Sequence, residues 1–400
     1  MHSGPGRSPE DQFLLKCATA GLHPGTSLNS RELFEKSLDW GQLVKRAITH
    51  GVAPLVCWSL KKAKDRILIP EDIFLRLEKT YYATGASNLK LLEKLKVILE
   101  SFEEAGIRVL VLKGPVLAAI TYPNMAVRPI SDLDLLILPE DYPRVCKVLE
   151  ALGYKLAPSI PVLEGSEVVE YAHYFSQVRF LGKDGTVVET HFCLLNMGVP
   201  REDTQVIWQR SVQFEGLGFK AQRPSLEDML IHLCLHAIQH NFSKLLYFCD
   251  IASLLQSHGT KLDWTYLTNA ARMRRMYPLV YYTLSICKEL LDANVPAEVL
   301  SELKPRLLRR KGFETIWDIN RVLALEKKKR PSAIEAVFCS LAEIDDFQTK
   351  LFYLWRVCFP RRKWLSAYFS RPVTSTGYIP DLSRYLMGNM FASKANGKSR

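Results

Sequence analysis

The chain has 400 residues, 48% of them hydrophobic, which suffices for a packed core and excludes wholesale disorder. The net charge of +11 is unevenly placed: residues 1–300 hold 33 basic and 33 acidic residues, whereas residues 301–400 hold 20 and 9. The basic segment 301–400 suits an acidic partner surface, or it is simply a solvated helical surface. No stable nucleic-acid partner is expected.

Nine cysteines are scattered without a C-x-x-C pair or zinc spacing, which favours reduced thiols. The first residues contain no apolar stretch of the kind that a secretory signal needs. No uncharged apolar run approaches the roughly 18 residues of a membrane-spanning helix. We therefore expect a cytoplasmic protein, with peripheral membrane contact left open.

The residues up to about 105 are predicted to be helical. Leu91, Leu95, Ile98 and Phe102 share one helix face, and Gly106 ends the pattern. From residue 106 the period changes: short strands are predicted within 107–112 and 130–138, and a capped amphipathic helix lies between them and Gly153. Two alternating strands then flank Asp184-Gly185, the strongest hairpin signal in the chain.

Helical periodicity returns at Ser225, which is placed to cap a helix, and continues to about residue 385. The expected organisation is thus an N-terminal helical region (1–105), an α/β core (106–222), a C-terminal helical domain (223–392) and a disordered tail (393–400). The fold class is α+β, with a small mixed sheet and flanking helices.

Asp132 and Asp134 lie one residue apart in the apolar run RPISDLDLLI. Side chains alternate across a strand, so both carboxylates point to the same side, about 6–7 Å apart at ~3.3 Å per residue. A divalent cation relieves their repulsion, and oxygen ligands favour Mg²⁺ or Mn²⁺ over zinc. The alternative, a strand edge that exposes both to water, is disfavoured by the apolar flanks.

A third carboxylate is available in TVVETHFCLL, where Glu189 and His191 share one strand face. Glu189 is the candidate to complete a metal site with Asp132 and Asp134. His191 either orients Glu189, touches a phosphate, or is a plain surface histidine.

Lys113 and Gly114 stand between a strand and a helix, where free N–H groups and a positive charge suit an anion. Pro115 fits the first helical position. Arg128 can hold a phosphate with two hydrogen bonds, or it forms a structural pair with one of the nearby aspartates.

Taken together, L-K-G at 112–114, Y-P at 122–123, R-P-x-x-D-x-D-L-L from Arg128 and E-T-H at 189–191 resemble a known pattern. It is that of the DNA polymerase β-like nucleotidyltransferases, and most closely of the minimal branch described only as uncharacterised nucleotidyltransferases. The resemblance spans about residues 85–260.

The resemblance implies that Asp132, Asp134 and Glu189 are catalytic and bind two Mg²⁺ (or Mn²⁺) ions. It implies that Lys113, Gly114, Arg128 and Ser131 hold a nucleoside triphosphate. Transfer of a nucleoside monophosphate to a hydroxyl or amine would release pyrophosphate. The acceptor is unknown: a sugar, a polysaccharide precursor, a small molecule or a peptide. Gly114-Pro115 departs from the family's usual Gly-Gly or Gly-Ser pair, and Glu189 stands where an Asp is usual.

The C-terminal helical region adds His232, His236 and His240, spaced to lie on one helix face. We expect His191, His236 and His240 to border a substrate cleft rather than to bind zinc, and Asp250 to pair with one of the histidines. The alternative is that the histidines of this helix simply cap the core of the α/β domain. Two alternatives to the enzyme remain: a non-catalytic nucleotide- or partner-binding module on the same fold, or a basic adaptor for nucleic acid or a membrane surface.

Overall fold

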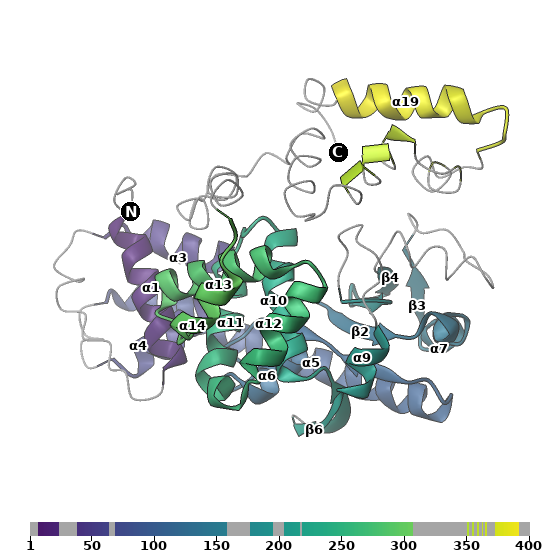
Figure 1. Ribbon diagram of the computed structural model, residues 1–400. Coiled ribbons are helices and arrows are strands. Elements are labelled where there is room, and N and C mark those ends of the chain that lie inside the picture. Colours follow the sequence, from purple (N-terminus) through teal and green to yellow (C-terminus); the bar gives the residue numbers. More distant parts are fainter. Residues whose placement is uncertain are drawn as a thin grey trace.

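The computed structural model describes residues 7–23, 38–63, 69–157, 177–194, 204–216, 218–306, parts of 350–365, and 373–391. Its strands form a seven-stranded mixed sheet in the order β3-β4-β5-β2-β1-β7-β6 (Figure 1). The strands are β1 (Val109–Val111), β2 (Leu133–Ile137), β3 (Tyr154–Leu156), β4 (Gln177–Gly182), β5 (Val187–His191), β6 (Val212–Gly216) and β7 (Phe219–Arg223). This arrangement confirms the α+β fold class.

The centre of the sheet places the candidate site. β1 runs antiparallel to β2, and β2 runs parallel to β5, with Asp134 paired to Glu189 and Leu136 paired to His191. β4 and β5 form the expected antiparallel hairpin around Gly185, whose φ of +85° is open to glycine. β7, the last strand of the sheet along the chain, pairs parallel with β1. All five residues of β2 are buried, so the strand is covered on both faces.

The helices before the sheet confirm the helical pattern expected there. They are α1 (Pro9–Leu22), α3 (Trp40–Thr49), α4 (Ala53–Lys61) and α5 (Glu71–Glu104). Of the predicted face, Leu95, Ile98 and Phe102 are buried, whereas Leu91 is only partly so, because Leu92 takes the inward position. Asn88 on α5 accepts from the Ile130 amide and donates to the carbonyls of Met125 and Arg128, so α5 holds the loop that leads into β2.

The chain between the strands forms α6 (Lys113–Ile120), η2 (Pro139–Asp141), α7 (Tyr142–Ala151) and α9 (Thr204–Gln209). α6 begins at Lys113, so the expectation that Pro115 is the first helical residue is wrong by two positions. The reason is local: Lys113 has a φ of +42°, and this left-handed residue turns the chain directly from β1 into the helix.

The helices that follow the sheet are α10 (Leu226–Gln239), α11 (Leu245–His258), η3 (Gly259–Lys261), α12 (Trp264–Met273), α13 (Tyr277–Leu291), α14 (Ala297–Leu303) and α19 (Tyr378–Phe391). Ser225 caps α10 as expected, because its side chain accepts from the amide of Asp228. Most of the basic segment 301–400, including the tail 393–400, lies outside the described residues.

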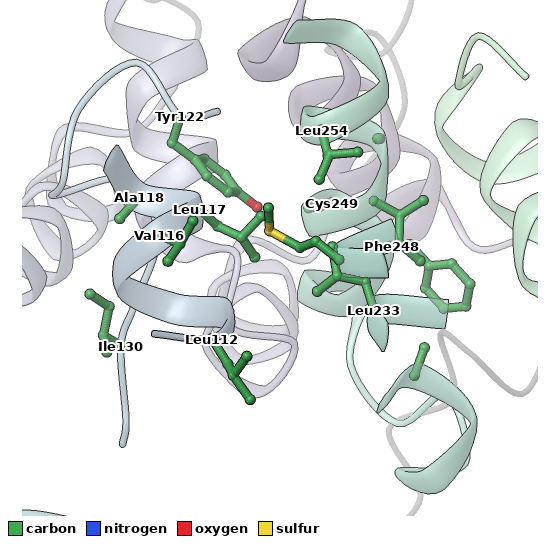
Figure 2. Packing of buried hydrophobic residues seen from close by; sticks show 14 of the residues in the cluster. Leu112, Val116, Leu117, Ala118, Tyr122, Ile130, Leu233, Phe248, Cys249 and Leu254 are labelled. Atoms are coloured by element: carbon green, nitrogen blue, oxygen red, sulfur yellow. The ribbon is translucent and has the colours of Figure 1, made fainter. Parts of the chain in front are cut away.

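One hydrophobic cluster joins the sheet and the helices from α1 to α14 and runs from Phe13 to Leu303, whereas α19 belongs to a second, small cluster with Leu365 and Val373. α1 packs on α11 and α13, so helices from both ends of the cluster lie side by side (Figure 1). Figure 2 shows the contact nearest the site, where Val116 and Leu117 of α6 face Leu233 of α10 and Cys249 of α11. No helix among the described residues is long and apolar enough to cross a membrane.

Candidate active site

The centre of the site is a group of three buried side chains on β2 and β5. Potential ligand atoms of Asp134, Glu189 and His191 all lie within 4.8 Å of one another. The register explains the grouping: Asp134 and Glu189 are direct neighbours across two parallel strands, and His191 lies two residues further along the same face. The opposite-face arrangement that would separate Asp134 from Glu189 is therefore excluded.

Asp132 lies outside this three-residue group although it was expected within it. It immediately precedes β2, is only partly buried, and accepts a hydrogen bond from the Ser131 hydroxyl at 3.1 Å. Burial and the charge of Asp134 raise the pKa of Asp132, and Glu189 adds to this effect. Asp132 therefore lies near enough to both carboxylates to feel their charge.

Asp134 is held by two cationic or donor groups. The ammonium of Lys113 lies 3.0 Å from its Oδ1, and the His191 Nε2 lies 2.8 Å from the same oxygen. Burial raises the pKa of Asp134, but Lys113 and His191 more than offset burial, so the pKa lies well below its usual value. Asp134 is thus a charged carboxylate although it is almost completely buried.

Lys113 reaches Asp134 because of the turn that precedes α6. The Leu112 amide donates to the Asp134 carbonyl at 2.9 Å, which extends the β1–β2 ladder up to the start of the helix. A lysine with positive φ is uncommon, and holding it there costs on the order of 1 kcal/mol. The surrounding structure therefore fixes an unfavourable backbone conformation at the residue that supplies the cation to the site.

Glu189 is also fully engaged. Its Oε1 accepts from the Nε of Arg179 at 2.8 Å, and its Oε2 accepts from the Gln177 side chain at 2.9 Å. Both partners lie on β4, where Arg179 is the residue directly paired with Glu189. The side chain of Arg179 is 52% exposed, so its guanidinium is accessible from solvent as well as from the site. Arg179 was not among the predicted site residues, although strand alternation on the predicted hairpin places it opposite Glu189.

Gly114 is required by close packing. A Cβ at this position would lie 2.9 Å from the Arg128 Nη1 and 3.1 Å from the Ile130 Cγ2. Gly114 therefore allows α6 to approach the loop that leads into β2, in addition to any role of its backbone toward an anion.

Arg128 forms a structural ion pair with Asp250, which was not among the partners expected for it. Its Nε and Nη2 donate to the two oxygens of Asp250 at 2.9 and 2.8 Å, and Tyr122 donates to Asp250 at 2.8 Å. The fork that was expected to hold a phosphate is thus bound to a carboxylate of α11. The expectation that Asp250 pairs with a histidine is wrong: its two oxygens accept from Arg128 and Tyr122, which lie in the segment between α6 and β2.

The histidines of α10 form a row that starts beside the three-residue group. The ring centroids of His191 and His232 are 6.5 Å apart, those of His232 and His236 are 6.4 Å apart, and those of His236 and His240 are 4.5 Å apart. Tyr247 lies 4.9 Å from His236 and 5.4 Å from His240. His232 is buried and His240 is exposed, so the row leads from the carboxylates to the surface.

The row is neutral at physiological pH. Burial and the charge of Lys113 lower the pKa of His232 to about 3, and they lower the pKa values of His236 and His240 as well. His232 faces the Leu194 carbonyl at 2.9 Å through its Nδ1. A neutral imidazole row beside three acids presents hydrogen-bonding groups to a bound molecule without adding positive charge.

These residues fit a divalent cation. Asp134, Glu189 and His191 offer two carboxylates and an imidazole in one buried place, and Asp132 adds a third carboxylate at the entrance to β2. Carboxylates suit Mg²⁺ and Mn²⁺, and an imidazole ligand is compatible with Mn²⁺ or Zn²⁺. Lys113 and Arg179 supply the positive charge that otherwise balances the carboxylates.

Comparison with protein families gives one match. Residues 36–325 match the model of a family described as "Uncharacterised nucleotidyltransferase". The matched range includes the whole sheet, α3 to α14 and every side chain of the candidate site. A search of curated proteins finds no match for the chain.

Proposed function

The chain belongs to this uncharacterised nucleotidyltransferase family, and on that premise we propose that it transfers a nucleoside monophosphate from a nucleoside triphosphate to an acceptor, releasing pyrophosphate. The acceptor group is a hydroxyl or an amine. One observation carries the proposal: Asp134 and Glu189 are buried neighbours on parallel strands, with His191 beside them and Asp132 at the strand entrance.

Asp132, Asp134 and Glu189 are the proposed catalytic carboxylates, and they would hold Mg²⁺ or Mn²⁺. Two such ions would supply the electrostatic stabilisation that in-line displacement at the α-phosphorus requires. The low pKa of Asp134 keeps this carboxylate ionised and ready to bind a cation throughout the physiological pH range. His191 would orient Asp134 through its 2.8 Å hydrogen bond.

Lys113 and Gly114 are the proposed nucleotide-binding residues at the start of α6, together with Ser131. Lys113 lies within reach of Asp134 and at a helix N-terminus, so its ammonium is placed to neutralise phosphate charge once Asp134 has another partner. Arg128 would support nucleotide binding indirectly, because its pairing with Asp250 fixes the loop that carries Ser131 and Asp132.

His236 and His240 are proposed to border the place of the nucleotide or the acceptor. They lie with Tyr247 at the outer end of the row that begins at the carboxylates, and neutral imidazole and phenol rings suit stacking against a base or a sugar. The proposed acceptor is a sugar, a polysaccharide precursor, a small molecule or a peptide.

The test is transfer of label. The protein is incubated with each of four α-³²P-labelled triphosphates, Mg²⁺ or Mn²⁺ and a cell extract, and both labelled product and pyrophosphate are measured. Asp134→Asn is expected to lose both signals. The matched control is Asp184→Asn, the same substitution in the exposed turn of the β4–β5 hairpin, where Asp184 pairs with Lys94. The control is expected to retain activity.

Three outcomes are distinguishable. Transfer that survives Asp134→Asn contradicts the proposed catalytic role of this carboxylate. Saturable binding of a triphosphate without turnover in the wild-type protein favours the non-catalytic binding module. Salt-sensitive binding to nucleic acid or anionic vesicles that is unaffected by Asp134→Asn favours the basic adaptor.

A further inference from the structure

The long helix α5 leaves one of its faces exposed although that face carries large hydrophobic side chains. α5 has 34 residues, which corresponds to about 50 Å at 1.5 Å per residue. Four of its residues are large, apolar and exposed: Leu75 (52%), Tyr82 (60%), Leu89 (51%) and Val97 (47%). Exposed apolar side chains are ordinary when they are scattered, but not when they form a line.

These four residues form a line. Leu75, Tyr82 and Leu89 are spaced by seven residues, and Val97 follows after eight, so every step is about two helical turns. The small exposed residue Ala86 lies at the midpoint of the line. Asn88, which holds the loop leading into β2, is buried on the opposite face of the helix. The line therefore faces away from the candidate site.

Two exposed charges interrupt the line at equal distances from its ends. Lys79 comes four residues after Leu75, and Glu93 comes four residues before Val97. Neither side chain forms an ion pair with any of the residues that the structure describes. The order along the helix is therefore apolar (Leu75), basic (Lys79), small (Ala86), acidic (Glu93) and apolar (Val97). Two copies of this order running in opposite directions pair apolar with apolar and basic with acidic residues.

We propose that this face of α5, defined by Leu75, Lys79, Ala86, Glu93 and Val97, is a homodimer interface that packs antiparallel against the same face of a second copy. In that arrangement Leu75 faces Val97 of the second copy, and Lys79 faces Glu93 of the second copy. Ala86 faces Ala86, which allows the helices to approach closely. The interface is isologous, as in most homodimers.

Charge selects the antiparallel direction. A parallel pair would place Lys79 against Lys79 and Glu93 against Glu93, and like charges facing each other across an interface are repulsive. The antiparallel pair forms two equivalent Lys–Glu contacts that flank the crossing point. Tyr82 and Leu89 add apolar area between these contacts on both sides.

The test uses the two charges on full-length protein, with the molecular mass measured by sedimentation or light scattering over a dilution series. Wild-type protein is expected to be a dimer. Lys79→Glu alone and Glu93→Lys alone are each expected to weaken the dimer at least tenfold, because each places like charges in both contacts. Lys220→Glu, an exposed lysine on β7, is the matched control and is expected to leave the dimer unchanged.

Mixing the two single variants is the decisive step. In a heterodimer of Lys79→Glu with Glu93→Lys, both contacts again join opposite charges, so equimolar mixing is expected to restore dimer from two monomeric samples. The double variant is expected to dimerise with itself for the same reason. Cooperative thermal unfolding of each single variant shows that it is folded, with a midpoint below that of the dimeric wild type because dimerisation stabilises the folded chain.

The proposal is overturned if the wild-type protein is monomeric up to about 100 μM, if the single variants dimerise as the wild type does, or if mixing restores nothing. A parallel pair gives the second result, because its contacts join like charges in the wild type and in either single variant; a face that binds a different protein gives the first. Because the face lies opposite Asn88, triphosphate binding and transfer by the monomeric variants report on the proposed function separately.

Discussion

Substitution of Lys113 tests how far charge balance, as distinct from packing, stabilises the candidate site. Its ammonium lies 3.0 Å from the Asp134 Oδ1, and the two side chains are only 9% and 3% exposed. Lys113→Met keeps an unbranched side chain and deletes the charge. Breaking a buried ion pair by removing one partner typically costs 3–5 kcal/mol, because the other charge is left uncompensated. His191 still contacts Asp134 at 2.8 Å, so we expect a loss of about 3 kcal/mol, at the lower end of that range.

A divalent cation is expected to reverse this loss. In the wild-type protein a metal at Asp134 competes with the Lys113 ammonium, whereas in Lys113→Met the carboxylate lacks this competitor. Stabilisation by a ligand rises as RT ln(1 + [L]/Kd), so a hundredfold tighter metal site gives about 2.7 kcal/mol more stabilisation at saturating ligand. Mn²⁺ is therefore expected to stabilise Lys113→Met more than the wild type, while nucleotide binding falls.

Urea unfolding with and without Mn²⁺ measures both effects, and electron paramagnetic resonance of free Mn²⁺ measures the affinity directly. Lys94→Met is the matched control, since Lys94 pairs with Asp184 at the surface of the hairpin and surface pairs contribute little. Equal stability of Lys113→Met and the wild type without metal, or equal stabilisation of both proteins by Mn²⁺, would contradict this charge balance.

Three further predictions concern the surroundings of the site. The pKa of His232 is about 3 in the folded protein and near 6.5 in the unfolded chain, so the unfolded chain binds a proton first as the pH falls. The free energy of unfolding is therefore expected to fall below about pH 6.5, by about 2 kcal/mol at pH 5. In urea unfolding, His232→Gln should show a shallower dependence of stability on pH. Arg128→Met should lower the free energy of unfolding by about 3–5 kcal/mol in the same assay, because it leaves the buried Asp250 carboxylate without its partner. The double variant Arg128→Met/Asp250→Leu should regain much of this loss, whereas strictly additive losses would contradict the pairing. Gly114→Ala should lower stability by about 1–3 kcal/mol, because its Cβ would lie 2.9 Å from the Arg128 Nη1; an unchanged melting temperature would contradict this packing.

The sequence was informative wherever the signal is local. The Asp184-Gly185 turn predicted the pairing of β4 with β5, in which Glu189 and His191 share a face, whereas the expected position of Asp132 beside Asp134 stays a prediction. The Ser225 cap is set by its own helix. Each of these features depends on residues close in sequence, which is why the family pattern and the fold class could be recognised before the structure was known.

The rest depends on contacts between distant segments. Nothing near Asp250 indicates that it accepts from Arg128, 122 residues earlier, and nothing near β7 indicates that it pairs with β1. Arg179 is an exception, because its position opposite Glu189 follows from the local pairing of β4 with β5, yet it was not among the predicted site residues. The left-handed backbone of Lys113 is also local, in the short turn between β1 and α6, but a lysine gives no signal for a positive φ.

The pairing of Arg128 with Asp250 has a consequence for how the molecule is made. The guanidinium belongs to the loop in front of β2, yet its carboxylate partner is supplied by α11, so a nascent chain that ends after β7 carries every candidate catalytic acid without this anchor. The loop that carries Asp132 can therefore reach its final position only after α11, well past the sheet, has been synthesised. Excising residues 106–222 for expression or grafting them onto another scaffold would separate the acids from the strut that sets their entrance loop.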